Sequence, residues 1–255
     1  MIRTETHDAI AIVQLNRPEA RNALTVAMLR DLSHTMAGLD RDDAIRCVIL
    51  TGADPAFCAG LDLKDLAATY NGATNRPTSD VEIRGLMPVM STPVIGAVNG
   101  PAVTGGLELA LSCDFLIASD RATFADTHGR VGVMPGGGMS IRLPQLVGLN
   151  RARQMSLTGN FLDAHTACNW GLVNEVVPHD ALMSRVMELA STIAENEPVS
   201  MRELLSMYEA FGHRGDDEAF LEESRWSRRW MRDRFDEKRF ASQRDQIIER
   251  GSQQQ

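Results

Sequence analysis

Short β-rich runs alternate with helical patterns along the first half of this 255-residue chain, and this alternation constrains the fold more than any other feature. Apolar residues recur at helical spacing between residues 23 and 32 and again between 104 and 113. The β-rich runs before, between and after them cover residues 10–15, 46–51, 93–98 and 114–118. Strands that alternate with helices in this way predict an α/β core with largely buried strands.

Beyond about residue 140 the strand signal is reduced to residues 173–177, and helical patterns follow Pro178 and Pro198 and cover residues 220–230. Residues 201–255 also hold seven of the 13 aromatic side chains and a group of five arginines between Arg225 and Arg234. We therefore predict a core over residues 1–200 and a helical oligomerisation or lid region over residues 201–255.

The composition excludes several kinds of protein. A net charge of −8 argues against a nucleic-acid-binding surface spread over the molecule, and the absence of a long apolar run argues against a membrane span. Only Lys64 and Lys238 are lysines, so Schiff-base chemistry has almost no candidates. The four cysteines lack CxxC spacing, which disfavours a zinc site or disulfide framework and predicts a reduced, cytoplasmic setting.

Two glycine-containing stretches, residues 57–63 and 99–108, form predicted strand-to-helix corners. Glycine lets a carbonyl or phosphate oxygen approach backbone amides closely. One amide from each corner would form an oxyanion hole, with each donor contributing about 3–4 kcal/mol in a dry site. Two tight turns without a ligand are an equally good interpretation of the spacing alone.

Three side chains near these corners could transfer protons. Glu108 lies in the first turn of an apolar helix, where a carboxylate is costly unless it is paired, protonated or catalytic, although it could simply complement the helix dipole. Asp126 and His128 would share a face of an extended segment, which precedes the glycine run 136–138. His128 could act as an acid or base, or be a surface histidine beside a turn. The GxSxG, GxGxxG, GxxxxGK[ST] and HExxH patterns of other enzyme classes are absent from the sequence.

Several stretches match a known family in order along roughly residues 10–180. They are NRPEARNAL (16–24), AFCAGLDL (56–63), PVIGAVNG (93–100) with GGLELA (105–110), Cys113-Asp114, PGGG (135–138), LTG (157–159) and GLVNEVV (171–177). With these stretches the chain resembles the crotonase, or enoyl-CoA hydratase/isomerase, superfamily.

The resemblance implies a spiral of ββα units, a helical C-terminal region used in trimerisation, and an acyl-CoA thioester as substrate. It places the oxyanion-hole amides at Leu61 and Gly105 and the CoA-binding residues at Arg21, Ala59, Asp62 and Leu63. It implies no metal and no separate cofactor, since CoA is part of the substrate. The expected partner is a second copy of the chain, in a homotrimer or dimer of trimers, with no nucleic acid and no membrane.

Glu108 falls on one of the two catalytic glutamates of the hydratases, and His128 occupies the position of the other. The leading hypothesis is an enoyl-CoA hydratase-like lyase of fatty acid or related acyl-CoA metabolism. The alternatives are an isomerase, a thioester hydrolase or a catalytically weak acyl-CoA-binding protein of the same fold.

Two further hypotheses concern segments outside these motifs. Arg225–Arg234 could bind RNA, but a helix packed on the core or on a neighbouring subunit is preferred. Residues 70–79 could cover the acyl tail, and Tyr70, Leu86, Met87 and Met134 could line its pocket or belong to the core.

Overall fold

The computed structural model describes residues 1–69 and 83–212, together with residues 221, 224, 225, 228, 229, 231–233 and 238. The strands are β1 (Ile2–His7), β2 (Ile10–Leu15), β3 (Cys47–Gly52), β4 (Ile83–Arg84), β5 (Met87–Pro88), β6 (Val94–Val98), β7 (Ala102–Val103), β8 (Phe115–Ser119), β9 (Thr123–Ala125), β10 (Leu162–Asp163) and β11 (Glu175–Val177).

Helices of the described residues fall into two kinds. The α-helices are α1 (Val26–Asp40), α2 (Leu63–Thr69), α3 (Gly105–Ala110), α4 (His128–Val131), α5 (Met139–Val147), α6 (Leu149–Thr158), α7 (Ala164–Trp170), α8 (Leu182–Ala194) and α9 (Pro198–Gly212). The 3-10 helices are η1 (Pro18–Ala20) and η2 (His179–Ala181).

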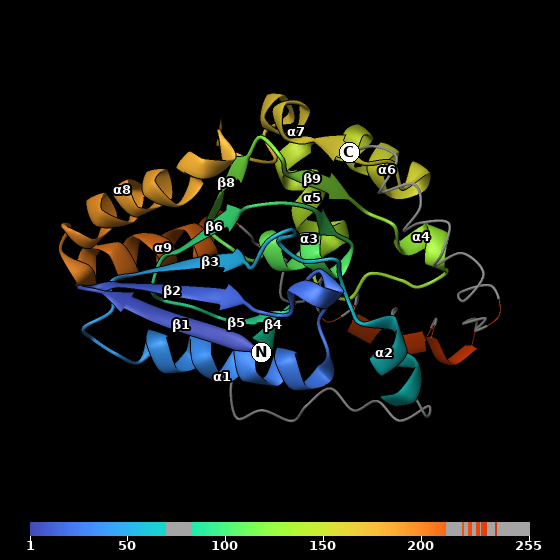
Figure 1. Ribbon diagram of the computed structural model, residues 1–255, viewed down its shortest axis with the longest axis horizontal. Helices are drawn as coiled ribbons and strands as arrows, with labels where there is room; N and C mark the ends of the chain where they lie inside the picture. The colour runs from blue at the N-terminus through green and yellow to red at the C-terminus, as the bar shows by residue number, and fades with distance from the viewer. Residues whose placement is uncertain are drawn as a thin grey trace.

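A six-stranded sheet in the order β1-β2-β3-β6-β8-β11 forms the centre of the molecule (Figure 1). The pairs from β2 to β11 are parallel, and β1 pairs antiparallel with β2. The five predicted strands are confirmed as β2, β3, β6, β8 and β11. The sequence does not predict β1, because most of its side chains are exposed and it therefore lacks an apolar pattern.

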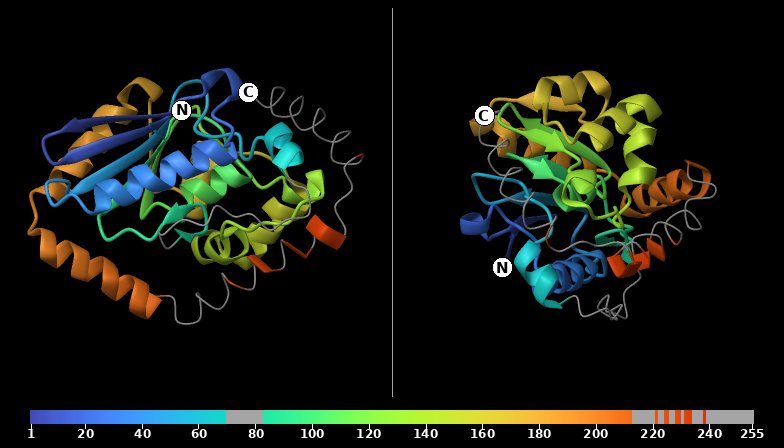
Figure 2. Two further views of the ribbon diagram at one scale, coloured as in Figure 1. Left: turned by 90° about the horizontal axis from the view of Figure 1, so that it is seen from below. Right: turned by 90° about the vertical axis from the view of Figure 1, so that its right-hand side faces the viewer.

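Side chains alternate between two apolar layers on the faces of this sheet. Ile49 and Ile95 pack with Leu182, Val186 and Ala190 of α8. The intervening residues of the same strands pack on the other face, in the cluster that contains α1 and α3. Figure 1 and Figure 2 show α1 and α8 on different sides of the strands. Burial on both faces explains why β3 and β6 are largely apolar.

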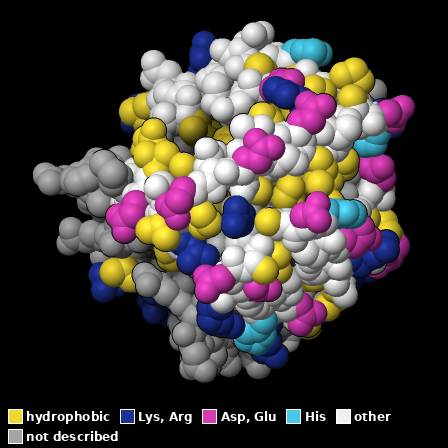
Figure 3. Space-filling view, turned by 90° about the vertical axis from the view of Figure 1, so that its left-hand side faces the viewer, with side chains coloured by type: hydrophobic (Ala, Val, Ile, Leu, Met, Phe, Trp, Pro, Cys, Tyr) yellow, Lys and Arg dark blue, Asp and Glu magenta, His cyan; other side chains and the backbone are white. Residues whose placement is uncertain are grey.

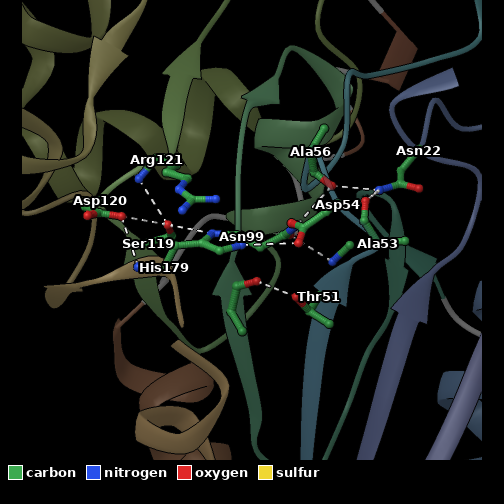
Figure 4. Close-up of polar contacts among 12 residues, drawn as sticks. Asn22, Thr51, Ala53, Asp54, Ala56, Asn99, Ser119, Asp120, Arg121 and His179 are labelled. Carbon is green, nitrogen blue, oxygen red and sulfur yellow. Dashed lines mark hydrogen bonds and ion pairs between the residues drawn. The ribbon is translucent and has the colours of Figure 1, made fainter. Parts of the chain in front are cut away.

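A polar network ties the loop after β3 to the ends of the neighbouring strands (Figure 4). The side-chain amide of Asn99, which follows β6, accepts a hydrogen bond from the Gly52 amide (3.2 Å) and donates one to Asp54 (2.8 Å). Asn22 donates to the carbonyls of Ala53 and Ala56, both at 2.7 Å. These bonds hold the segment that leads into the first predicted corner.

His179 extends the network to β8. Its Nδ1 lies 3.0 Å from the Ser119 hydroxyl, and its Nε2 lies 3.2 Å from Asp54 Oδ2. The Asp120 carboxylate accepts a hydrogen bond from the His179 backbone amide at 3.0 Å. The start of η2 is thereby joined to the loop after β3, although the two are far apart in the sequence (Figure 4).

The helical patterns after Pro178 and Pro198 are confirmed as α8 and α9, and α9 crosses the predicted boundary at residue 200. Most of the region beyond it, including most of residues 220–230 and part of the Arg225–Arg234 segment, lies outside the described residues, so the two-unit division stays a prediction. Within the described part, no helix combines the length and apolarity needed to cross a membrane.

Replacing Asn22 with alanine should lower the free energy of unfolding by about 1–3 kcal/mol, because the half-buried Ala53 carbonyl loses its donor and the buried Ala56 carbonyl keeps only the longer hydrogen bond from Asn99. Urea unfolding measures the change. Asn150→Ala, at an exposed position of α6, is the matched control and should change stability little. Equal effects of the two substitutions would contradict this account of the loop.

Candidate active site

The two predicted corners are joined to each other by backbone hydrogen bonds. The Cys58 amide donates to the Pro101 carbonyl (3.0 Å), and the Val103 amide donates to the Cys58 carbonyl (2.9 Å). A Cβ atom at Gly106 would collide with the Cys58 carbonyl, so only glycine permits this approach. The structure therefore brings the two predicted corners together through their backbones.

The amides of Leu61 and Gly105 lie next to each other at this junction. Leu24 bonds to the Gly60 carbonyl and to the Asp62 amide, both at 2.8 Å, so the intervening Leu61 amide points away from Leu24. A Cβ atom at Gly105 would lie 3.4 Å from the Leu61 nitrogen. Among the described residues, neither amide donates a hydrogen bond. Two adjacent donors of this kind can hold one oxygen atom.

Thr104 links this junction to the segment that carries Asp126 and His128. Its amide donates to the Ala125 carbonyl (2.8 Å), and its hydroxyl contacts that of Thr127. Its φ of 54° lies in the left-handed region, a strained conformation for threonine that is often found at functional sites. Thr104 directly precedes α3 and Thr127 directly precedes α4. Because β7 pairs with β9 and the two threonine hydroxyls are in contact, the two helices begin next to each other.

The carboxylate of Glu108 is buried and held by the start of α5. Its Oε1 accepts hydrogen bonds from the amides of Gly137 (2.8 Å) and Met139 (3.3 Å). A Cβ atom at Gly137 would lie 2.8 Å from Glu108 Cδ. The glycine run before α5 thus permits the chain to bind its own carboxylate, a role that sequence analysis does not predict because the partner is distant in the sequence.

His128 lies between two carboxylates. Its Nδ1 is 2.7 Å from Asp126 Oδ1, and its Nε2 is 3.7 Å from Glu108 Oε2. All three residues are buried, so the interpretation of His128 as a surface histidine is wrong. Burial by itself would raise the pKa of Asp126, but the hydrogen bond and the charge of His128 outweigh it, and the pKa lies below its usual value.

The predicted CoA-binding residues surround the first corner. Arg21 is exposed, and its carbonyl accepts a hydrogen bond from the Ala59 amide (3.0 Å). Ala59 and Leu63 are half-buried. The structure therefore brings Arg21 and Ala59 together at the first corner, while their contact with CoA stays a prediction.

Asp62 has a structural partner that sequence analysis missed. Its carboxylate forms an ion pair with Arg17 (2.8 Å) and accepts hydrogen bonds from the amides of Lys64 and Asp65 at the start of α2. Arg17 also donates to the Ala23 carbonyl (2.7 Å). Burial tends to raise the pKa of Asp62. The hydrogen bond and the charge of Arg17 lower it by more, so the pKa lies below its usual value.

The candidate pocket residues have different environments. Met87 is part of the core, whereas Leu86 lies against Gly137, beside Glu108. Met134 is half-buried. Tyr70 and the rest of residues 70–79 lie outside the described residues. Among those described, no group of three or more His, Cys, Asp or Glu side chains is placed to hold a metal ion.

Comparisons with known proteins identify the family of this chain. Residues 5–245 match the family described as enoyl-CoA hydratase/isomerase. The probable peroxisomal enoyl-CoA hydratase 1 of Arabidopsis thaliana is 40% identical over 188 residues, which cover 74% of this chain and 70% of that protein. The short-chain-enoyl-CoA hydratase of Clostridium acetobutylicum is 37% identical over 201 residues, which cover 78% of this chain and 77% of that protein.

Solved structures show the same fold. An enoyl-CoA hydratase from Mycobacterium smegmatis superposes with a TM-score of 0.81 at 45% identity, covering 91% of this chain and 98% of that chain. The predicted crotonase-like α/β class is thereby confirmed.

Replacing Asp62 with asparagine should destabilise the protein at neutral pH, and the difference from wild type should shrink as the pH falls. The lowered pKa means that Asp62 stabilises the fold above its unfolded-state pKa near 4, and that this stabilisation is lost as the pH falls through the folded-state value. Urea unfolding from about pH 6 to about pH 3 tests this. Asp31→Asn, at an exposed position of α1, is the control. A destabilisation that does not change with pH would contradict the role assigned to the Arg17–Asp62 pair.

Proposed function

This chain belongs to the enoyl-CoA hydratase/isomerase family and is an enoyl-CoA hydratase-like lyase, and we propose that it adds water across the 2,3 double bond of a 2-enoyl-CoA thioester with Glu108 and His128 as its acid–base pair. The observation that carries the proposal is the 3.7 Å approach of His128 Nε2 to Glu108 Oε2 in a buried site. That site adjoins the N-terminus of α3, where Gly105 lies.

The Leu61 and Gly105 amides would bind the thioester carbonyl oxygen. When water adds to C3, the electrons of the double bond move toward the carbonyl and an enolate-like negative charge develops on its oxygen. Two amides that have no other acceptor among the described residues are suited to stabilise this charge. Their proposed contribution is about 3–4 kcal/mol per donor.

Hydration needs two proton transfers. One group removes a proton from water as the water oxygen bonds to C3, and another gives a proton to C2. Glu108 and His128 provide two such groups. A double-bond shift needs only one group to carry a proton between carbons, and mere binding needs none, so the pair favours hydration over these alternatives.

The exposed Arg21 would bind phosphate groups of CoA, for which a guanidinium is suited, while Ala59, Asp62 and Leu63 would form the loop around the rest of the carrier. No other cofactor and no metal is part of the proposal. We place the reaction in fatty acid or related acyl-CoA metabolism. We propose a cytoplasmic setting because all four cysteines are free thiols. Burial raises the pKa of two of them, Cys47 and Cys58, to about 12.

We also propose a homotrimer or dimer of trimers. Large apolar side chains are exposed on helices α5, α6 and α9, namely Leu146, Leu149, Leu157, Val199, Leu204 and Tyr208. On the face that Figure 3 shows, hydrophobic patches alternate with acidic and basic side chains. Exposed apolar side chains are those that a neighbouring subunit can cover.

Replacing Glu108 with glutamine should lower kcat for crotonyl-CoA hydration by about 10²–10⁴-fold, because the amide cannot accept a proton from water. Loss of absorbance of the enoyl thioester measures turnover, and calorimetry with the saturated thioester measures binding, which should persist. Glu203→Gln, at an exposed position of α9, is the control. Absence of turnover by the wild type with short and long 2-enoyl-CoAs, or an unchanged rate in the Glu108 variant, would overturn the proposal.

Replacing Arg21 with alanine should raise KM for crotonyl-CoA and leave kcat nearly unchanged, because the guanidinium binds a part of the substrate that does not react. The crotonyl thioester of N-acetylcysteamine, which lacks the phosphates, should be turned over equally by both proteins. Arg153→Ala, at an exposed position of α6, is the matched control. A KM effect of the same size with the truncated thioester would show that Arg21 does not recognise phosphate.

A further inference from the structure

Asp126 contacts His128 twice and lies on the side of the imidazole opposite Glu108. One of its carboxylate oxygens accepts hydrogen bonds from the His128 backbone amide (3.1 Å) and from the ring Nδ1 (2.7 Å). We propose that Asp126 is a positioning residue that holds His128 in the orientation and protonation pattern of a proton donor to C2 of the substrate. This inference rests on the proposed function, because it assigns roles within that acid–base pair.

The contact with Asp126 determines which ring nitrogen can transfer a proton. A carboxylate only accepts hydrogen bonds, so Nδ1 must carry a hydrogen whether the imidazole is neutral or charged. The lowered pKa of Asp126 keeps this carboxyl ionised. Nε2 is therefore the nitrogen that gains and loses a proton, and it is the one that faces Glu108 at 3.7 Å.

The surroundings of Glu108 favour the opposite role for that residue. Two backbone amides at the start of α5 donate to its Oε1, and hydrogen bonds of this kind favour the ionised carboxylate. His128 then lies between two carboxylates, one near each ring nitrogen, in a buried site. This arrangement stabilises the imidazolium, so the mobile proton resides on His128 Nε2 and Glu108 is ready to accept one.

Neighbouring contacts limit the movement of the Asp126–His128 pair. The ring and the backbone of His128 share one acceptor oxygen, which restricts rotation of the side chain. Asp126 is also hydrogen-bonded to Ser156 of α6. The Thr127 amide between them donates to the Thr104 hydroxyl (3.2 Å), which joins the pair to the residue that precedes Gly105.

These assignments give a balanced reaction. Glu108 removes a proton from water while the water oxygen bonds to C3, and the double-bond electrons move onto the thioester oxygen. As the carbonyl re-forms, the electron pair at C2 takes the Nε2 proton of His128. The proton now on Glu108 returns to the neutral His128, so one water has been added and both residues are restored.

Replacing Asp126 with asparagine should lower kcat by about 10- to 100-fold while KM changes less than about twofold, because the proton donor is misplaced and the thioester site is intact. The alkaline limb of the kcat–pH profile should move to lower pH, because the imidazolium loses a neighbouring negative charge. Adding Asp126→Asn to His128→Gln should lower kcat little further, since the residues act as one unit. Asp31→Asn is the matched control for charge removal at an exposed site.

A second measurement does not depend on a folded variant. Nitrogen-15 NMR of the wild-type histidines should show a hydrogen on Nδ1 of His128 throughout the titration, with Nε2 as the titrating nitrogen. A bare Nδ1, or an Asp126→Asn variant with the wild-type kcat and pH profile, would overturn the inference. Both outcomes differ from failure of the wild type to hydrate any enoyl-CoA, which would overturn the proposed function itself.

Discussion

The burial of the Glu108 carboxylate is the constraint on which the site depends. A charged group removed from water is costly unless hydrogen bonds or opposite charges replace its hydration. Here the amides of Gly137 and Met139 bind one oxygen, and His128 approaches the other. Three segments must therefore converge on the first turn of α3. They are the glycine run, the start of α5 and the segment after β9.

The backbone junction between the two corners places that carboxylate beside a pair of amide donors. Its contacts involve main-chain atoms of Cys58, Pro101 and Val103, and they are possible because Gly106 has no side chain. Strands β3 and β6, which lead into the corners, are buried on both faces between α8 and the helices of the other layer. A rigid sheet thus supports two loops whose amides must be placed to within a fraction of an ångström.

Asp62 and Asp126 are two carboxylates near the site that have different partners. Asp62 is assigned to CoA binding by resemblance. It is held by Arg17 and by the amides that begin α2, so it also stabilises the loop to which it belongs. Asp126, one of the three proton-transfer candidates from the sequence, is buried against His128. The charged partner of Asp62 is Arg17, 45 residues away in the sequence, whereas His128 is only two residues from Asp126.

The sequence alone determined the strands from β2 onward in the main sheet, the helices α8 and α9, and the two corners, because these depend on local apolar periodicity and on glycine positions. It did not predict β1, whose exposed side chains leave no apolar pattern. It identified Glu108 and His128 as separate candidates with open alternatives. Only the tertiary structure decided that they face each other, that Asp126 lies behind His128 and that the glycine run holds Glu108, because these contacts depend on how distant segments pack together.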